Sequence, residues 1–227
     1  MFNVNIKLFG YKELFNHFIK LNIKDKFPNR LLLTGQEGIG KTTFAFHLIN
    51  YLLSENEPTR YIQDLGQINS DSISYNLVKN NSHPNFFLIN ILEDKKVIEI
   101  DQIRKMINYS KKSSFNNKQK VILIDNADKL NPNSSNALLK ITEEPNDNTL
   151  FIFIFDNTKK ILETIRSRCI KFNFTLSSKK CIEITDKIIV DKVENLLSKD
   201  LINHYHSIND YINLIKFSDS SNLDLTQ

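Results

Sequence analysis

The chain is poor in cysteine and in long apolar runs. Its 227 residues include only two cysteines, Cys169 and Cys181, which are too few for a disulfide framework or a four-cysteine zinc site. The longest apolar run, residues 150–155, has the length of a strand, whereas a helix that crosses a bilayer needs roughly 18 to 20 apolar residues. We therefore expect no membrane span. No charged-then-apolar secretory leader is visible either, so the expected compartment is cytoplasmic.

Charge of one sign is also scarce. The 30 Lys and Arg against 26 Asp and Glu give a formal net charge of +4 at pH 7, which does not imply strong autonomous DNA binding. With 41% hydrophobic and 25% charged residues, the composition is that of an ordinary folded protein. The length allows one large domain, alone or with a small appendage.

Apolar runs of strand length alternate with helical patterns over most of the chain. This alternation is typical of an α/β fold with a parallel sheet. Two of the runs are apolar on both faces, as central parallel strands are, and residues 54–84 are expected to form a loop-rich insertion. Strands are predicted at residues 30–34, 86–89, 121–124, 151–155 and 170–174, and helices at 10–22, 41–53, 100–107, from Asn131-Pro132 onward, and at 160–168.

The strand signal fades after Phe174. Three helical patterns follow, at residues 177–189, 191–203 and 207–217, and they predict a small helical appendage. We therefore expect an α/β domain over residues 1–174 and an all-helical domain over residues 175–227.

A glycine-rich loop lies between the first predicted strand and the helix that follows it. Its glycines let backbone N–H groups turn inward around phosphate oxygens, and the helix directs its positive N-terminal end at them. In such a P-loop the lysine, here Lys41, reaches the terminal phosphates, and the hydroxyl of Thr42 binds Mg²⁺. A simple glycine turn is the weaker alternative, because a strand and a helix flank the motif as the mechanism requires. The predicted nucleotide-binding segment is Gly35-Gln36-Glu37-Gly38-Ile39-Gly40-Lys41-Thr42-Thr43.

A second metal ligand is expected where the apolar strand 121–124 ends. Asp125 follows this strand directly, and the carboxyl end of a parallel strand faces the ligand crevice. Thr42 and Asp125 are therefore the predicted Mg²⁺ ligands of an ATP site, although a solvated Asp in a turn remains an alternative for Asp125. The next residue is Asn126, which cannot accept a proton from an attacking water. Asp128 is expected to be a surface charge.

Several motifs follow one another along the chain: residues 34–43, Ser82-His83-Pro84, Asp125-Asn126-Ala127-Asp128, Asn136-Ala137-Leu138-Leu139-Lys140 with Glu143-Glu144-Pro145, and Thr164-Ile165-Arg166-Ser167-Arg168-Cys169. In this order and at this spacing they resemble the AAA+ clamp loaders of bacterial DNA polymerase III, and among these the delta-prime family in the form that lacks a zinc module. The resemblance covers most of residues 8–174. It implies a three-layer P-loop AAA+ domain followed by a helical lid.

The resemblance also implies roles for two further residues. Arg168 corresponds to an arginine finger that acts in trans on the ATP site of a neighbouring subunit, although for an arginine outside this motif, pairing with a local carboxylate is the more common role. Asn157, at the polar end of the strand 151–155, corresponds to a sensor of the terminal phosphate, and an Asx turn is an equally good explanation of this residue. The implied partners are other clamp-loader subunits in a hetero-oligomer and, through that complex, the sliding clamp and primer-template DNA.

Three departures from the family pattern limit these implications. Residues 43–120 contain no cysteine, so no zinc is expected. No arginine follows Arg168, so nucleotide sensing by the lid should be weak or should depend on lysine. The chain after Phe172 is long enough for a three-helix lid but not for the additional collar domain of the family. Either the collar is lost or the sequence is a fragment.

Three functions are compatible with the sequence. The first is a clamp-loader subunit that binds its neighbours, ATP and Mg²⁺, contributes Arg168 and hydrolyses little itself. The second is an active ATP-hydrolysing motor subunit of the same loader, which the intact Lys41, Thr42 and Asp125 permit. The third is an unrelated P-loop nucleotide-binding protein, which the motif at residues 136–140 argues against.

Overall fold

The computed structural model describes residues 4–143, 148–159, 163–221 and 223–226. Within these residues, five strands form one sheet in the order β2-β3-β4-β1-β5, and every neighbouring pair is parallel. The prediction of a parallel α/β sheet is therefore confirmed. The strands are β1 (Arg30–Gly35), β2 (Phe86–Ile89), β3 (Lys120–Ile124), β4 (Thr149–Asp156) and β5 (Ile170–Asn173).

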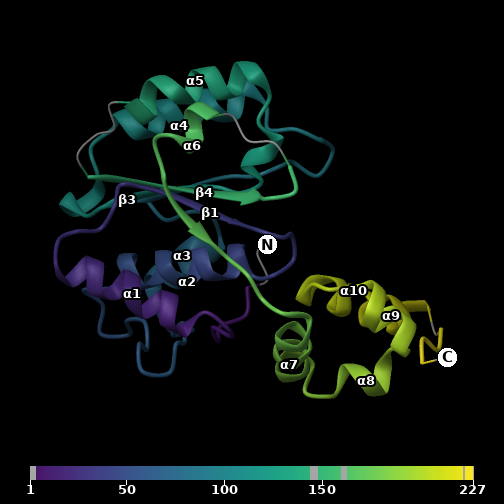
Figure 1. Cartoon of the computed structure of the whole chain (residues 1–227). Helices are drawn as coiled ribbons and strands as arrows, with labels where there is room; N and C mark the ends of the chain where they lie inside the picture. Colours follow the sequence, from purple (N-terminus) through teal and green to yellow (C-terminus); the bar gives the residue numbers. More distant parts are fainter. Residues whose placement is uncertain (1–3, 144–147, 160–162, 222, 227) are drawn as a thin grey trace.

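Helices cover both faces of the sheet. Figure 1 shows α1, α2 and α3 on one side of the strands and α4, α5 and α6 on the other. The helices are α1 (Lys12–Ile23), α2 (Lys41–Leu53), α3 (Ile73–Lys79), α4 (Ile100–Lys111), α5 (Pro132–Glu143), α6 (Glu163–Arg166), α7 (Ser178–Ile189), α8 (Val193–Leu196), α9 (Lys199–His204) and α10 (Ile208–Ser221), with two short 3-10 helices, η1 (Phe115–Asn117) and η2 (Ala127–Lys129).

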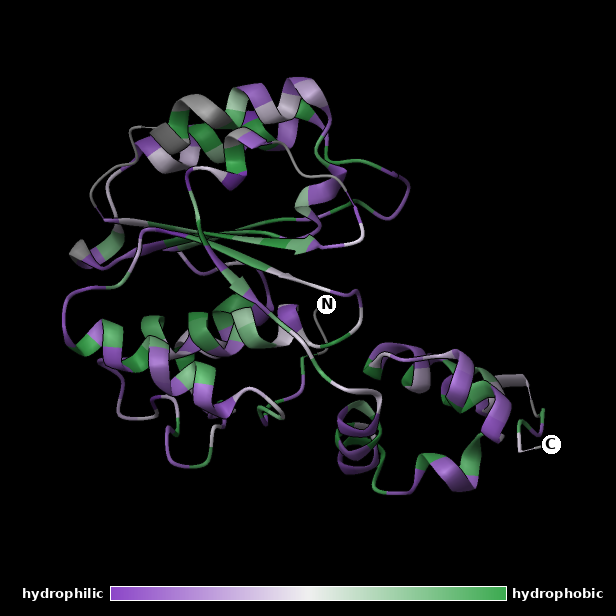
Figure 2. Ribbon diagram, viewed as in Figure 1, coloured by the Kyte–Doolittle hydropathy of each residue, from purple (hydrophilic) through white to green (hydrophobic). Residues whose placement is uncertain are grey.

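The two faces of the sheet contribute to two separate hydrophobic cores. Leu31 and Leu33 of β1 lie in the core with α1 and α2, while Leu32, which points to the opposite face, lies in the core with α4 and α5. Residues of β4 alternate in the same way. This explains why β3 and β4 carry apolar side chains on both faces after their first residues, the buried Lys120 and Thr149. Figure 2 shows the central strands largely in the hydrophobic colour.

The helices that follow β5 have a core of their own. The buried side chains of this third core include Cys181 of α7, Val193 of α8 and Tyr211 of α10, and Figure 1 shows α7 to α10 gathered to one side of the layered part. The sequence predicts a single helix over residues 191–203, and this prediction is wrong. The backbone is extended at Leu197, whose side chain is buried in the third core, so the helix is divided there into α8 and α9.

Other boundaries can be compared with the sequence. The cap predicted for α5 is confirmed, because Oδ1 of Asn131 accepts a hydrogen bond from the backbone N–H of Ser134 at 2.8 Å. The insertion at 54–84 is less irregular than expected, since it contains α3, whose N-terminus is capped by the hydroxyl of Ser72. Residues 144–145 of the quoted motif and residues 160–162 of the predicted helix 160–168 lie outside the described residues. None of the described helices is long and apolar enough to span a membrane.

Candidate functional site

The glycine-rich loop connects β1 to α2 at the carboxyl edge of the sheet. Gly40 precedes α2 with φ +94°, a left-handed conformation that side chains disfavour, so glycine is required at this helix start. The hydroxyl of Tyr11 donates to the carbonyl oxygen of Ile39 at 3.0 Å. The loop is thus held from the α1 side in the conformation that exposes the N-terminus of α2.

The start of α10 covers the tip of this loop. The backbone N–H of Asn209 donates to the carbonyl oxygen of Gly38 at 3.1 Å. A Cβ atom added to Gly38, which has φ +79°, would lie 2.3 Å from Oγ of Ser207. Glycine at position 38 therefore allows the start of α10 to pack directly against the loop.

Lys41, the first residue of α2, is buried at 6% exposure. Its Nζ donates to the carbonyl oxygens of Gly35 at 2.8 Å and of Gln36 at 2.5 Å. Burial lowers the pKa of Lys41, and nearby carboxylates, foremost that of Asp156, oppose the shift. The ammonium group of Lys41 therefore lies inside the loop, near several carboxylates. In a P-loop, the lysine at this position binds phosphate.

Thr42 and Asp125 meet as the sequence predicts. Oγ1 of Thr42 donates to Oδ2 of Asp125 at 3.1 Å, which joins the start of α2 to the end of β3. Burial raises the pKa of Asp125, and the hydrogen bonds from Thr42 and from the backbone N–H of Asn126 only partly oppose this. A partly buried carboxylate beside a hydroxyl is an oxygen donor set that suits Mg²⁺, and a cation there would offset the desolvation of the charge. Among the described residues, no cluster of three or more His, Cys, Asp or Glu could hold a metal by itself.

A cavity of about 890 Å³ lies between this edge of the sheet and the helices α7 and α10. Its volume is in the range of small-molecule and cofactor sites, roughly 300 to 1,000 Å³. Of the predicted nucleotide-binding segment, Glu37, Gly38, Gly40, Lys41, Thr42 and Thr43 line the cavity. Gln36 is exposed, and the side chain of Ile39 is buried in the hydrophobic core instead. The helical side of the cavity is mixed: Asp191, Asn209, Lys216 and Asp219 line it together with the apolar residues Ile188, Ile189, Leu196, Ile208, Ile212 and Ile215.

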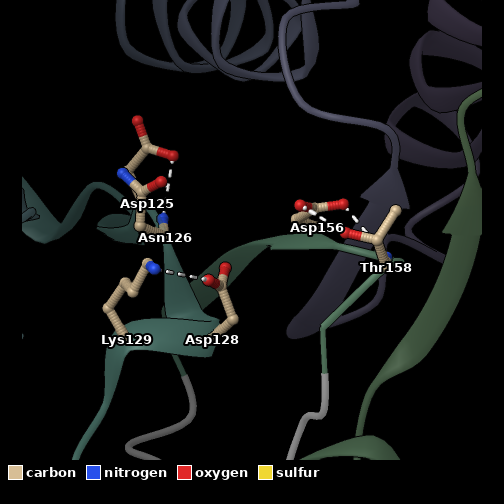
Figure 3. Close-up of polar contacts among 6 residues, drawn as sticks. All are labelled: Asp125, Asn126, Asp128, Lys129, Asp156 and Thr158. Atoms are coloured by element: carbon tan, nitrogen blue, oxygen red, sulfur yellow. Dashed lines mark hydrogen bonds and ion pairs between the residues drawn. The ribbon is translucent and has the colours of Figure 1, made fainter.

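Asp128 is not the surface charge that the sequence suggests. Its side chain is only 5% exposed and lines the cavity, 4.0 Å from Nζ of Lys129 (Figure 3). Asn126 has φ +57°, and this left-handed residue precedes η2, the 3-10 helix that contains Asp128. Asn tolerates the left-handed conformation, so Asn126 was a signal in the sequence for a tight turn that buries the side chain of Asp128.

The end of β4 brings a different residue to the cavity from the one that the sequence favours. Asn157 is exposed and is not among the cavity-lining residues, whereas Asp156 is. The carboxylate of Asp156 accepts hydrogen bonds from the backbone N–H of Thr158 at 3.0 Å and from its hydroxyl at 2.8 Å (Figure 3). The chain does leave β4 through an Asx turn, but the side chain that forms this turn is that of Asp156 and not that of Asn157. An acid directly after a two-sided apolar strand was the signal that could have identified it.

Arg168 lies far from the cavity-lining edge of its own sheet. It belongs to the turn between α6 and β5, where its backbone N–H donates to the carbonyl oxygen of Ile165 at 3.2 Å. Strand β5 is parallel to β1 and starts with Ile170 beside Leu31. Arg168 therefore precedes the amino end of β5, at the edge opposite the glycine-rich loop.

Comparison with known proteins identifies relatives along most of the chain. The sequence model of a family described as "DNA polymerase III, delta subunit" matches residues 10–178. The DNA polymerase III subunit delta' of Pseudomonas aeruginosa is 31% identical over 140 residues, which are 62% of this chain and 41% of that protein. The subunit delta' of Bacillus subtilis is 27% identical over 194 residues, 84% of this chain and 55% of that protein. The chain thus spans about half the length of these relatives.

Solved structures with the same fold include two from Thermotoga maritima. A DNA polymerase III gamma subunit-related protein has a TM-score of 0.52 and 14% identity, covering 88% of this chain and 57% of that one. The RuvB Holliday junction branch migration motor has a TM-score of 0.51 and 14% identity, covering 95% of this chain and 64% of that one. At this identity the likeness shows the fold alone, which is that of AAA+ proteins.

Proposed function

Because this chain belongs to the DNA polymerase III delta subunit family, we propose that it works in the cytoplasm as a subunit of the clamp loader. In this role it binds neighbouring subunits in a hetero-oligomer and helps the complex to load the sliding clamp onto primer-template DNA. It is a part of the polymerase holoenzyme, with little ATPase activity of its own.

The subunit binds ATP together with Mg²⁺. The observation that carries this proposal is the hydrogen bond between Thr42 and Asp125 on the wall of the cavity that also contains Lys41. Thr42 and Asp125 would hold the Mg²⁺, which neutralises phosphate charge when bound. On binding, the ammonium group of Lys41 leaves the two loop carbonyls and donates to phosphate oxygens. Apolar residues of α7 and α10, such as Ile188 and Ile212, offer contacts to the rest of the nucleotide.

Titration calorimetry with Mg-nucleotide tests this part of the proposal. Lys41→Ala is expected to weaken binding at least tenfold, on the order of 1.4 kcal/mol or more, because the cation that meets the phosphates is lost. Lys20→Ala, which removes an exposed lysine of α1, is the matched control and should leave the affinity unchanged. No measurable affinity in the unmutated chain would contradict nucleotide binding and leave the loop as a scaffold.

Hydrolysis by the isolated subunit should be slow. The residue after Asp125 is Asn126, so the attacking water has no proton acceptor at this position. Asn126→Glu supplies an acceptor and is the change expected to raise turnover. Steady-state turnover of about 1 s⁻¹ or faster by the unmutated chain, as in ordinary enzymes, would instead favour the alternative of an active motor subunit, which the pairing of Thr42 with Asp125 permits.

Arg168 acts on the ATP site of a neighbouring subunit. Its position at the edge opposite the glycine-rich loop supports a role across an interface rather than in its own cavity. Arginine fingers are worth roughly 10³ to 10⁵ in rate in P-loop systems, so even a small part of this effect is measurable. Arg168→Ala should lower the DNA-stimulated ATPase of the reconstituted loader while the nucleotide affinity of this subunit stays the same.

The nearby Arg166→Ala is the control for this experiment, because Arg166 is exposed and its ion pair with Glu163 is long, at 4.0 Å. It should leave the ATPase of the loader unchanged. If Arg168→Ala lowers the melting temperature of the isolated chain and weakens assembly to the same extent, Arg168 is a structural residue and the trans role is wrong.

A further inference from the structure

The cavity described above is acidic, although the ligand proposed for it is a polyanion. Two lysines, Lys41 and Lys216, line it within the described part of the chain. The acidic residues that line it are Glu37, Asp125, Asp128, Asp156, Asp191 and Asp219. Each added phosphate brings further negative charge into this partly enclosed space, where like charges repel more strongly than in water.

Asp156 is the acid best placed to meet the last phosphate. Strand β4 pairs with β1 in a register that sets Asp156 directly beside Gly35, the first residue of the glycine-rich loop. Among the carboxylates that attract the ammonium group of Lys41, that of Asp156 has the largest effect. Asp156 also lines the same cavity as Lys41, whose ammonium group serves the terminal phosphates in a P-loop, so its carboxylate lies at the wall of the space that these phosphates would occupy.

The carboxylate of Asp156 is also held in place. One oxygen accepts the backbone N–H of Thr158 and the other accepts its hydroxyl, so the group cannot turn away without losing both bonds (Figure 3). Asp125 is also held through both oxygens, by Thr42 and by the backbone N–H of Asn126, but its pairing with the Thr42 hydroxyl suits a cation. The repulsion from Asp156 is therefore a fixed property of the site.

We propose that Asp156 makes this cavity select a nucleoside diphosphate over the corresponding triphosphate. The proposal rests on the proposed nucleotide binding and names the form that is preferred. A diphosphate engages the backbone N–H groups of the loop without placing a third phosphate against Asp156. A triphosphate gains contact with Lys41 but meets the fixed carboxylate, and the repulsion offsets that gain.

The test is titration calorimetry of the full chain with MgADP and with MgATP, at one ionic strength. The unmutated chain is expected to bind MgADP at least tenfold more tightly than MgATP. Asp156→Asn keeps an oxygen that can accept from Thr158 but removes the charge, and it should reduce this ratio at least fivefold, chiefly through tighter binding of MgATP. Asp156→Ser, a second uncharged variant, should do the same, and thermal melting confirms that both variants are folded.

Asp101→Asn is the control, because it removes an exposed carboxylate of α4 remote from the cavity. It should leave both affinities and their ratio unchanged. Equal affinity of the unmutated chain for MgADP and MgATP, or an equal change of both in Asp156→Asn, overturns the selection while nucleotide binding stands. Binding of neither nucleotide overturns the proposed function, and the selection with it.

Discussion

Lys41 and Lys120 are both buried lysines, and the surroundings of their ammonium groups differ. Lys120 is 3% exposed, and its Nζ donates to the carbonyl oxygens of Tyr109 at 3.0 Å, of Ser110 at 3.3 Å and of Lys112. These carbonyls are at the C-terminal end of α4, where the helix dipole favours a cation, and that of Tyr109 also accepts the backbone N–H of Lys112 at 3.2 Å. Lys41 donates to two carbonyls of the glycine-rich loop and faces a cavity.

The charges around the two groups differ as well. Burial lowers the pKa of both lysines. Carboxylates oppose this shift at Lys41, whereas the neighbouring charge at Lys120 is the ammonium group of Lys112, which lowers the pKa further. A buried cation whose donors all serve a helix end stabilises the fold. A buried cation held by a loop, among acids and beside a cavity, can exchange its partners for a ligand.

The largest effect on stability is expected from Lys120→Met. The substitution keeps most of the apolar stem but removes the ammonium group from three carbonyls at the end of α4. The carbonyl of Tyr109 keeps the backbone N–H of Lys112, while those of Ser110 and Lys112 lose the ammonium donor, at a cost of about 4 kcal/mol. The melting temperature should fall on the order of 10 °C. Lys111→Met removes an exposed lysine from the same helix end and should cost less than about 0.5 kcal/mol. Equal losses in the two variants would remove the distinction between a buried cap and a surface charge.

A somewhat smaller effect is expected from His47, a third buried base that stays neutral. Its Nε2 donates to the carbonyl oxygen of Asn5 at 2.9 Å, and the hydroxyl of Tyr61 donates to its Nδ1 at 2.8 Å, a tautomer assigned from these partners. Burial lowers the pKa of His47 to about 4, and the hydrogen bond to Asn5 opposes this only partly. The unfolded chain takes up a proton near pH 6.5 and the folded chain only near pH 4. Stability should therefore fall by about 3 kcal/mol as the pH falls through this window.

Urea denaturation between pH 7.5 and pH 4 measures this loss. In His47→Gln most of the slope should disappear, although the variant is less stable at pH 7. Some slope is expected to remain, because burial also lowers the pKa of His83. An unchanged slope in His47→Gln would show that other groups are responsible for the acid sensitivity.

The smallest effect on stability is expected from Lys41→Met, less than about 1 kcal/mol. The carbonyl of Gly35 keeps a second donor, the backbone N–H of Asn157 at 3.3 Å, and Gln36 is exposed, so water can replace the ammonium group at its carbonyl. The same variant should lose at least tenfold in nucleotide affinity, so stability and binding would separate. A melting temperature lowered as far as in Lys120→Met would mean that Lys41 is a structural cap as well.

The local part of this site could be predicted because its signals lie close together in the chain. Gly40, with its left-handed backbone, starts α2 at Lys41, where the change from strand pattern to helical pattern places it. Asp125 follows a strand that is apolar on both faces, and its contact with Thr42 follows from the parallel arrangement of β1 and β3 in one sheet. Glycine chemistry and apolar periodicity are both local, and both were correct here.

The remaining part depends on contacts between distant segments. The register of β4 with β1 decides which residue at the end of β4 faces the cavity. This register places Asp156 beside Gly35. The role of Lys120 depends on the end of α4 lying next to the start of β3. The order of the strands and the break at Leu197 are likewise decided by packing, which periodicity within one segment does not report.

The contact between Gly38 and the start of α10 gives the helical part of the chain a thermodynamic link to the loop. The N–H of Asn209 and the hydroxyl of Ser207 both meet Gly38, so a shift of α10 and a rearrangement of the loop tip cannot be independent. A ligand that reshapes the loop changes the equilibrium position of α10. By reciprocity, a neighbouring protein that moves α10 changes the affinity for that ligand by the same factor.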